Sequence, residues 1–124
     1  MVAASALLAG CAFDVIHVDQ EAVQYKPTTA PGPVLTLQDD VKVSIVGHGS
    51  ATPLKKGTTW QKVGEIDAGD VFAPQDQVVT VEASNAYEAE PVIAHGEVVG
   101  FFLVVQHTFT PADPPAPVAF LPKS

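Results

Sequence analysis

The chain has 124 residues, 47% of them hydrophobic, and a formal charge of −8 from fourteen acidic side chains against six lysines and no arginine. This length corresponds to one domain, and the apolar content supports a packed core, which excludes a wholly disordered chain. The lack of arginine and of a basic patch excludes nucleic acid as a partner, and no apolar run approaches the ~20 residues of a membrane-spanning helix.

The N-terminal segment predicts an export signal. Residues 2–9 are apolar apart from Ser5, small residues follow, and the only cysteine of the chain stands at position 11. An apolar stretch followed by small residues is typical of a cleaved targeting segment. The alternative is a short packed helix with the cysteine buried, but a single unpaired thiol in an exported protein calls for another use.

The sequence LAGC at residues 8–11 resembles the lipobox of bacterial lipoproteins. The resemblance implies that residues 1–10 are a lipoprotein signal peptide and that Cys11 is acylated, which makes the membrane a partner. Two or more acyl chains anchor stably, because each buried CH₂ contributes ~0.8 kcal/mol. In such lipoproteins an aspartate after the cysteine favours the inner membrane. Ala12 therefore implies the outer membrane, with the protein facing the periplasm.

Residues 11–32 are predicted as the lipid anchor and a spacer, since their apolar residues follow no clear period. Residues 33–109 are predicted as a β-domain. Alternation of valine and isoleucine with polar residues at 41–45 indicates a half-buried strand, and residues 58–66 predict another.

Residues 78–105 predict a three-stranded antiparallel meander. The glycine at residues 95–96 readily takes the positive φ of a tight hairpin. Residues 98–105 are apolar on both faces, which predicts a central strand covered on both sides. Pro91 cannot donate a ladder hydrogen bond, so its strand is expected to lie at an edge or to be irregular there.

Residues 110–124 contain five of the eleven prolines and are predicted as a proline-rich tail outside the sheet, clipped to the domain by Phe120 and Leu121. Strong helix signals are missing after residue 30. The predicted fold class is therefore all-β, closed as a small antiparallel barrel or a two-layer sandwich.

Two motifs in the second half, GTTWQKVGEI at residues 57–66 and GDVFAP at residues 69–74, are followed by Glu88-Ala89 and Gly100-Phe101. This pattern resembles a group of small bacterial outer-membrane lipoproteins without an assigned activity. The resemblance covers about half the chain and implies an envelope location. Members of the group often have arginines around the tryptophan, where this chain has Thr59 and Lys62.

No catalytic constellation is recognisable. Ser50 beside His48 does not form a G-x-S-x-G elbow, and the aspartates of residues 67–76 lack the spacing of a calcium loop. We therefore predict that the protein is not an enzyme and uses no cofactor. The alternative is a small periplasmic metal-binding protein or enzyme, which would use His48, His95, Asp67 and Asp70.

The sequence as a whole predicts a lipid-anchored cell-envelope lipoprotein with a non-catalytic binding or structural role. Another envelope protein is the expected partner besides the membrane. The candidate binding surface consists of Trp60, Asp70 and Tyr87. Aromatic side chains on strands also pack in cores, so a core position is the competing interpretation for the two aromatic residues.

Overall fold

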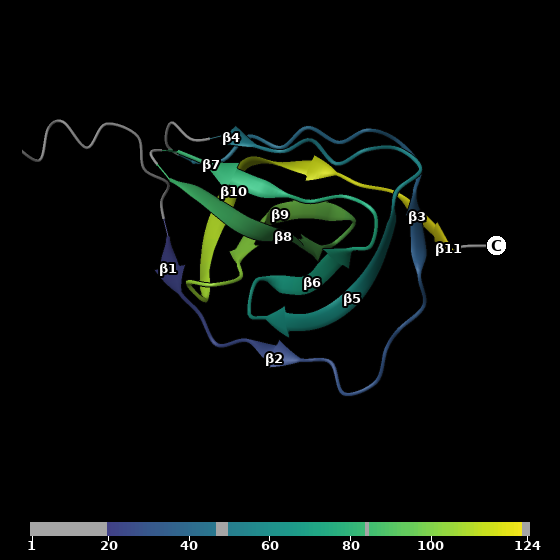
Figure 1. The fold of residues 1–124 in the computed structure, drawn as a ribbon, viewed down its shortest axis with the longest axis horizontal. Coiled ribbons are helices and arrows are strands. Elements are labelled where there is room, and N and C mark those ends of the chain that lie inside the picture. Colours follow the sequence, from purple (N-terminus) through teal and green to yellow (C-terminus); the bar gives the residue numbers. More distant parts are fainter. Residues whose placement is uncertain (1–19, 47–49, 84, 123–124) are drawn as a thin grey trace, which may run out of the picture.

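The computed structural model describes residues 20–46, 50–83 and 85–122, which form eleven antiparallel strands and no helix (Figure 1). The predicted all-β class is confirmed. Within these residues there is accordingly no helix long and apolar enough to cross a membrane. The strands are β1 (Glu21–Ala22), β2 (Lys26–Pro27), β3 (Leu35–Leu37), β4 (Ser50–Ala51), β5 (Thr59–Ile66), β6 (Gly69–Pro74), β7 (Thr80–Glu82), β8 (Ala86–Ala94), β9 (Glu97–Leu103), β10 (Thr108–Pro117) and β11 (Phe120–Pro122).

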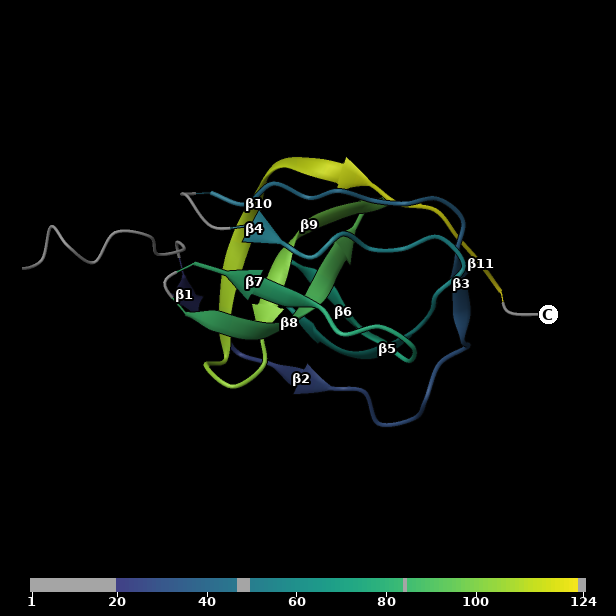
Figure 2. The ribbon, with the colours of Figure 1, turned by 45° about the horizontal axis from the view of Figure 1, so that its top comes forward.

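The described strands belong to one sheet with the order β1-β10-β9-β8-β6-β5-β3-β11, to which β2 is added on β5 and β4 on β7. One side of β8 pairs with β9, and the other side pairs first with β7 and then with β6. Figure 2 shows β4 and β7 in front of β9 and β10, as a second layer. The sheet is not closed into a barrel, so the topology is consistent with the sandwich alternative.

The predicted meander is confirmed as β7-β8-β9, and β9 is its covered strand. Phe101 is fully buried in a first core with Trp60 and Leu103, whereas Phe102 points to the opposite face, into a second core with Phe109. The hairpin between β8 and β9 turns at residues 95–96, both of which have positive φ (54° and 74°). Alternation of side chains along β9 therefore supplies both cores.

Pro91 occupies an interior strand, and of the two alternatives predicted for it, an edge position or an irregularity, the irregularity is confirmed by a register shift between Val92 and Ile93. The backbone N–H of Ala89 donates to the carbonyl of Val79 at 3.0 Å, on the β7 side. The nitrogen of Pro91, two residues on, faces the same side. On this side of β8, the pairing with β7 has ended before Pro91 and the pairing with β6 begins after it. A backbone N–H at residue 91 would therefore have no strand partner, and its absence costs no hydrogen bond.

The proline-rich segment differs from the prediction, because residues 108–117 form strand β10 and pair with β9. Pro114 and Pro115 are tolerated because the register breaks between Pro111 and Ala116, where the chain is out of the ladder with β9. Residues 44–46 bond to β10 from the other side. The predicted clip is confirmed, since Phe120 and Leu121 lie in β11 and pair with β3.

Residues 20–32 belong to the segment predicted as the lipid anchor and spacer, and the structure places strands of this segment against the domain. Their strands β1 and β2 pair with β10 and β5. Tyr25 stacks on Phe102 with the ring centroids 4.8 Å apart, and its hydroxyl donates to the carbonyl of Val63 at 2.9 Å. Tyr25 thereby covers the second core, and this packing is the physical reason why the segment lies against the domain. We call residues 20–29 the strap; Cys11 lies outside the described residues.

Candidate functional site

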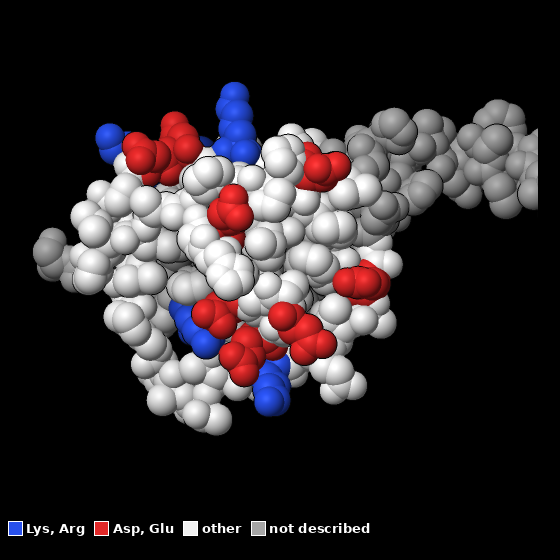
Figure 3. All heavy atoms as spheres, turned by 180° about the vertical axis from the view of Figure 1, so that it is seen from behind, with Lys and Arg blue, Asp and Glu red and all other residues white. Residues whose placement is uncertain are grey.

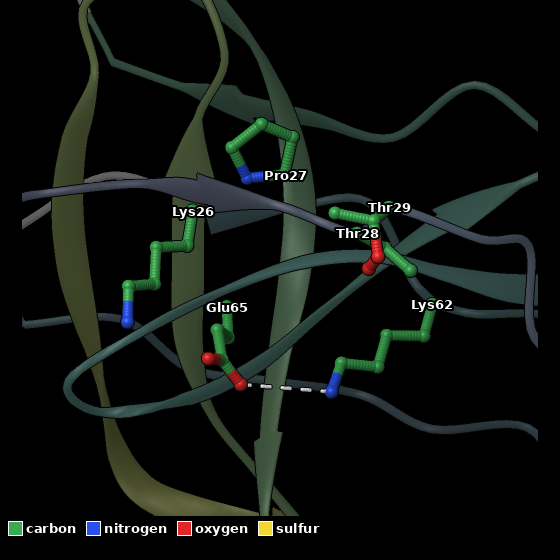
Figure 4. A pocket seen from close by; sticks show the side chains of 6 residues that line it. All are labelled: Lys26, Pro27, Thr28, Thr29, Lys62 and Glu65. Carbon is green, nitrogen blue, oxygen red and sulfur yellow. Dashed lines mark ion pairs between the residues drawn. The ribbon is translucent and has the colours of Figure 1, made fainter.

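A groove of about 460 Å³ lies between the strap and β5 (Figure 4). It exists because β2 pairs with the second half of β5, placing Lys26 directly opposite Glu65. We call it the strap groove. Its lining is polar apart from one proline and consists of Lys26, Pro27, Thr28, Thr29, Lys62 and Glu65.

The charges of the strap groove are arranged around Lys62. Its Nζ lies 3.2 Å from Oδ1 of Asp70 and 3.6 Å from Oε2 of Glu65. The hydrogen bond with Asp70 and the two nearby carboxylates raise the pKa of Lys62 above its ordinary value. In Figure 4 the carboxylate of Glu65 lies between the ammonium groups of Lys26 and Lys62. Two ammonium groups and one carboxylate thus line the groove, with the carboxylate of Asp70 beside it, an arrangement suited to binding a polar group that carries both donors and acceptors.

The loop after β2 arches away from β5 and is fixed at both ends. The N–H of Thr28 donates to the carbonyl of Val63 at 2.8 Å, and Nε2 of Gln61 donates to the carbonyl of Gly32 at 2.7 Å. A second hollow of about 220 Å³ shares Thr28 and Lys62 with the strap groove. The face behind Figure 1 shows acidic side chains gathered near two basic ones (Figure 3). The two hollows therefore meet at Thr28 and Lys62.

A separate pocket of about 230 Å³ lies against β8, where β6 ends and β7 begins, and includes Glu88 and Glu90. These carboxylates are two residues apart and share one face of the strand. Burial, and to a smaller extent the charge of Glu88, raises the pKa of Glu90 to about 7. Burial and the charge of Glu90 in turn raise the pKa of Tyr25. This pocket therefore couples an acidic pair to the residue that holds the strap.

The variant Glu90→Gln is expected to stabilise the protein above pH 7. The pKa of Glu90 rises from 4.5 to about 7 on folding, so the folded state keeps a proton that the unfolded state has lost. The free energy of unfolding of the wild-type protein therefore falls as the pH rises from 4.5 to about 7. Because solvent screens a partly exposed side chain, we expect Glu90→Gln to raise the free energy of unfolding at pH 8 by only about 1–2 kcal/mol. This difference from the wild type should vanish near pH 4.

Urea unfolding at pH 4, 6 and 8 checks this expectation. Glu21→Gln, which removes one charge from an exposed position on β1, is the matched control. A Glu90→Gln protein with the same pH profile as the wild type would contradict the assignment of the raised pKa to this carboxyl.

The structure does not bring the three residues of the predicted binding surface together. Trp60 is fully buried in the first core, so the prediction that it forms part of a binding surface is wrong. Its Nε1 donates to Oγ1 of Thr58 at 2.8 Å. Asp70 lies beside the strap groove, where it pairs with Lys62. Tyr87 packs against the first core at the start of β8.

Of the residues of the metal alternative, Asp67 and Asp70 belong to the β5–β6 hairpin, and Asp70 pairs with Ile93, close to the turn that holds His95. His95 is exposed in the β8–β9 turn, and Asp67 lies in the turn between β5 and β6. Among residues 20–46, 50–83 and 85–122, no three His, Cys, Asp or Glu side chains are placed to hold a metal ion. His48 lies outside these ranges.

Sequence analysis missed the residues that the strap contributes to the groove. Lys26 and Thr28 belong to a segment predicted as a spacer, and no local pattern indicates that it pairs with β5. The nearest signal is Tyr25, a large aromatic residue in an otherwise polar stretch.

Comparisons of the chain with protein-family models, with curated proteins and with solved structures found no match.

Proposed function

We propose that the protein is a lipid-anchored lipoprotein of the bacterial outer membrane, whose β-domain faces the periplasm and has a non-catalytic binding or structural role. The observation that carries the proposal is the LAGC sequence at residues 8–11, which holds the only cysteine of the chain. The described domain begins at Gln20, only nine residues after Cys11. An acylated Cys11 would hold the domain close to a bilayer.

The strap groove supports a binding role within this proposal. Lys62 is held in place by Asp70 and Glu65, so its ammonium group is positioned before any partner arrives. Preorganised polar groups lose less conformational entropy on binding than free side chains do. A polar segment of another envelope protein, carrying both carboxylates and hydrogen-bond donors, is the partner that this chemistry suits.

The variant Cys11→Ala tests the anchor. We expect the wild-type protein to incorporate radioactive palmitate in bacterial cells and to sediment with the outer membrane. Cys11→Ala should take up no label, because the thiol that would carry the acyl chains is gone. Mass spectrometry of both products measures the lipid and the processing.

Ala12→Ser is the matched control, since it changes the neighbouring residue and leaves the thiol in place. The proposal fails if Cys11→Ala still takes up palmitate and stays membrane-bound, or if the wild-type protein carries a free thiol at Cys11.

A further inference from the structure

The strap enters the domain beside the turn between β9 and β10. Glu21 pairs with Phe109, and Oγ1 of Thr108 donates to Oε1 of Gln20 at 2.8 Å. The N–H of Val23 donates to the carbonyl of His107 at 3.3 Å. Figures 1 and 2 both show β1 at the end of the molecule opposite β3 and β11. The first described residues are thus fixed to one end of the domain, and the β9–β10 turn belongs to this end.

The strap cannot swing freely at this point. The ring of Tyr25 is stacked on Phe102 and occupies the space above Gly64, and its hydroxyl is bonded to Val63. Gln20 follows an acylated Cys11 by nine residue steps, and a chain of this length spans at most about 30 Å when fully extended. A tether of this length keeps the β1 end nearer to the membrane than the β11 end.

The β9–β10 turn combines an exposed apolar side chain with a lack of carboxylates. Val105 lies in this turn with 76% of its surface exposed. The turn, residues 104–107, reads VVQH and contains no carboxylate, although the chain has fourteen acidic residues. Burial of a carboxylate in a lipid interface is costly, whereas burial of a valine is favourable. Leu121 is exposed to 55%, but it lies on β11 at the opposite end.

We propose that the β1 end of the domain faces the bilayer and that only the tip of the β9–β10 turn enters it, inserting Val105 among the lipid headgroups and upper acyl chains while the exposed Glu21 of β1 stays in water. This inference rests on the proposed acylation of Cys11. One valine is enough as a second contact, because the tether already holds the turn at a high effective concentration beside the bilayer. The domain would then be anchored in a fixed orientation, with β11 directed into the periplasm.

Tryptophan fluorescence of the lipidated protein tests the orientation. Val105→Trp is reconstituted in vesicles of phosphatidylethanolamine and phosphatidylglycerol, and Leu121→Trp is the matched control. The native Trp60 is buried and gives the same background in both proteins. We expect vesicles to shift the emission of the Val105→Trp protein to the blue and lipids with brominated acyl chains to quench it at least twofold. The Leu121→Trp protein should show neither change.

Hydrogen exchange of the unmodified lipidated protein gives an independent measurement. The amides of residues 104–107 should exchange more slowly in vesicles than in a non-lipidated form with Cys11→Ser mixed with the same vesicles. A lipidated protein whose Val105→Trp emission matches that of Leu121→Trp overturns the orientation and leaves the anchor intact. A protein found without lipid by mass spectrometry overturns both the anchor and the orientation.

Discussion

Gly100→Ala is expected to destabilise the protein by about 3 kcal/mol, the upper range for an overpacked core, or to prevent folding. Gly100 pairs with Pro111 of β10 and with Val92 of β8. A methyl group at this position would lie 2.5 Å from Cε1 and Cζ of Phe109 and would also overlap the carbonyl oxygen of Thr110. A backbone carbonyl in a ladder cannot rotate away, so relief requires the separation of β9 from β10.

Gly32→Ala is the matched control for this variant, because nothing lies within 4 Å of a methyl group built there. Urea unfolding followed by far-UV circular dichroism should give Gly32→Ala a free energy of unfolding within about 0.5 kcal/mol of the wild-type value. Equal free energies of unfolding for Gly100→Ala and Gly32→Ala would show that Phe109 does not pack over β9 as described.

The central part of the fold could be predicted because its signals are local. Alternation of apolar residues along β7 and β8, the glycine of the β8–β9 turn, and the two apolar faces of β9 are each contained in fewer than ten consecutive residues. Such patterns report which faces of a strand are buried, without any knowledge of its partner. The meander and the covered position of β9 followed directly.

The position of β10 could not be predicted, because the effect of a proline depends on the direction in which its nitrogen faces. Pro111 pairs with Gly100, and Pro114 lies where the ladder with β9 is interrupted. Either proline would disrupt a sheet in another register. The register is set by β9 and residues 44–46, which lie far away in the sequence.

The candidate site shows the same limit. Asp70 belongs to the predicted binding surface, and the structure places it beside the strap groove. Its partner Lys62 stands out in the sequence only as a position where the similar lipoproteins often have an arginine. Lys26 faces Glu65 because β2 pairs with β5, and this contact has no local signature. For Trp60 the sequence allowed a surface or a core position. The core position is possible because Thr58 accepts the indole hydrogen bond, which leaves no polar group unpaired on burial.

Gly64→Ala is expected to release the strap while the rest of the sheet stays folded. A methyl group on Gly64 would lie 2.5 Å from Cε1 of Tyr25 and would overlap Cζ and the hydroxyl oxygen. The ring is stacked on Phe102 and cannot move deeper, so it must leave its place. Loss of this packing and of the hydrogen bond to Val63 should cost about 2 kcal/mol. Hydrogen exchange should accelerate in residues 20–29 and stay slow in β8 and β9.

A double-mutant cycle with Tyr25→Ala separates this cause from a general effect on β5. Each single variant should speed exchange in the strap, and the double variant should be no worse than either, because the methyl group then meets no ring. Additive losses of stability, or fast exchange in β8 and β9 of Gly64→Ala, would contradict the packing of Tyr25 over Gly64. In the lipidated protein the same variant should weaken the contact of the β9–β10 turn with the bilayer, because a released strap lengthens the tether and frees the domain to turn.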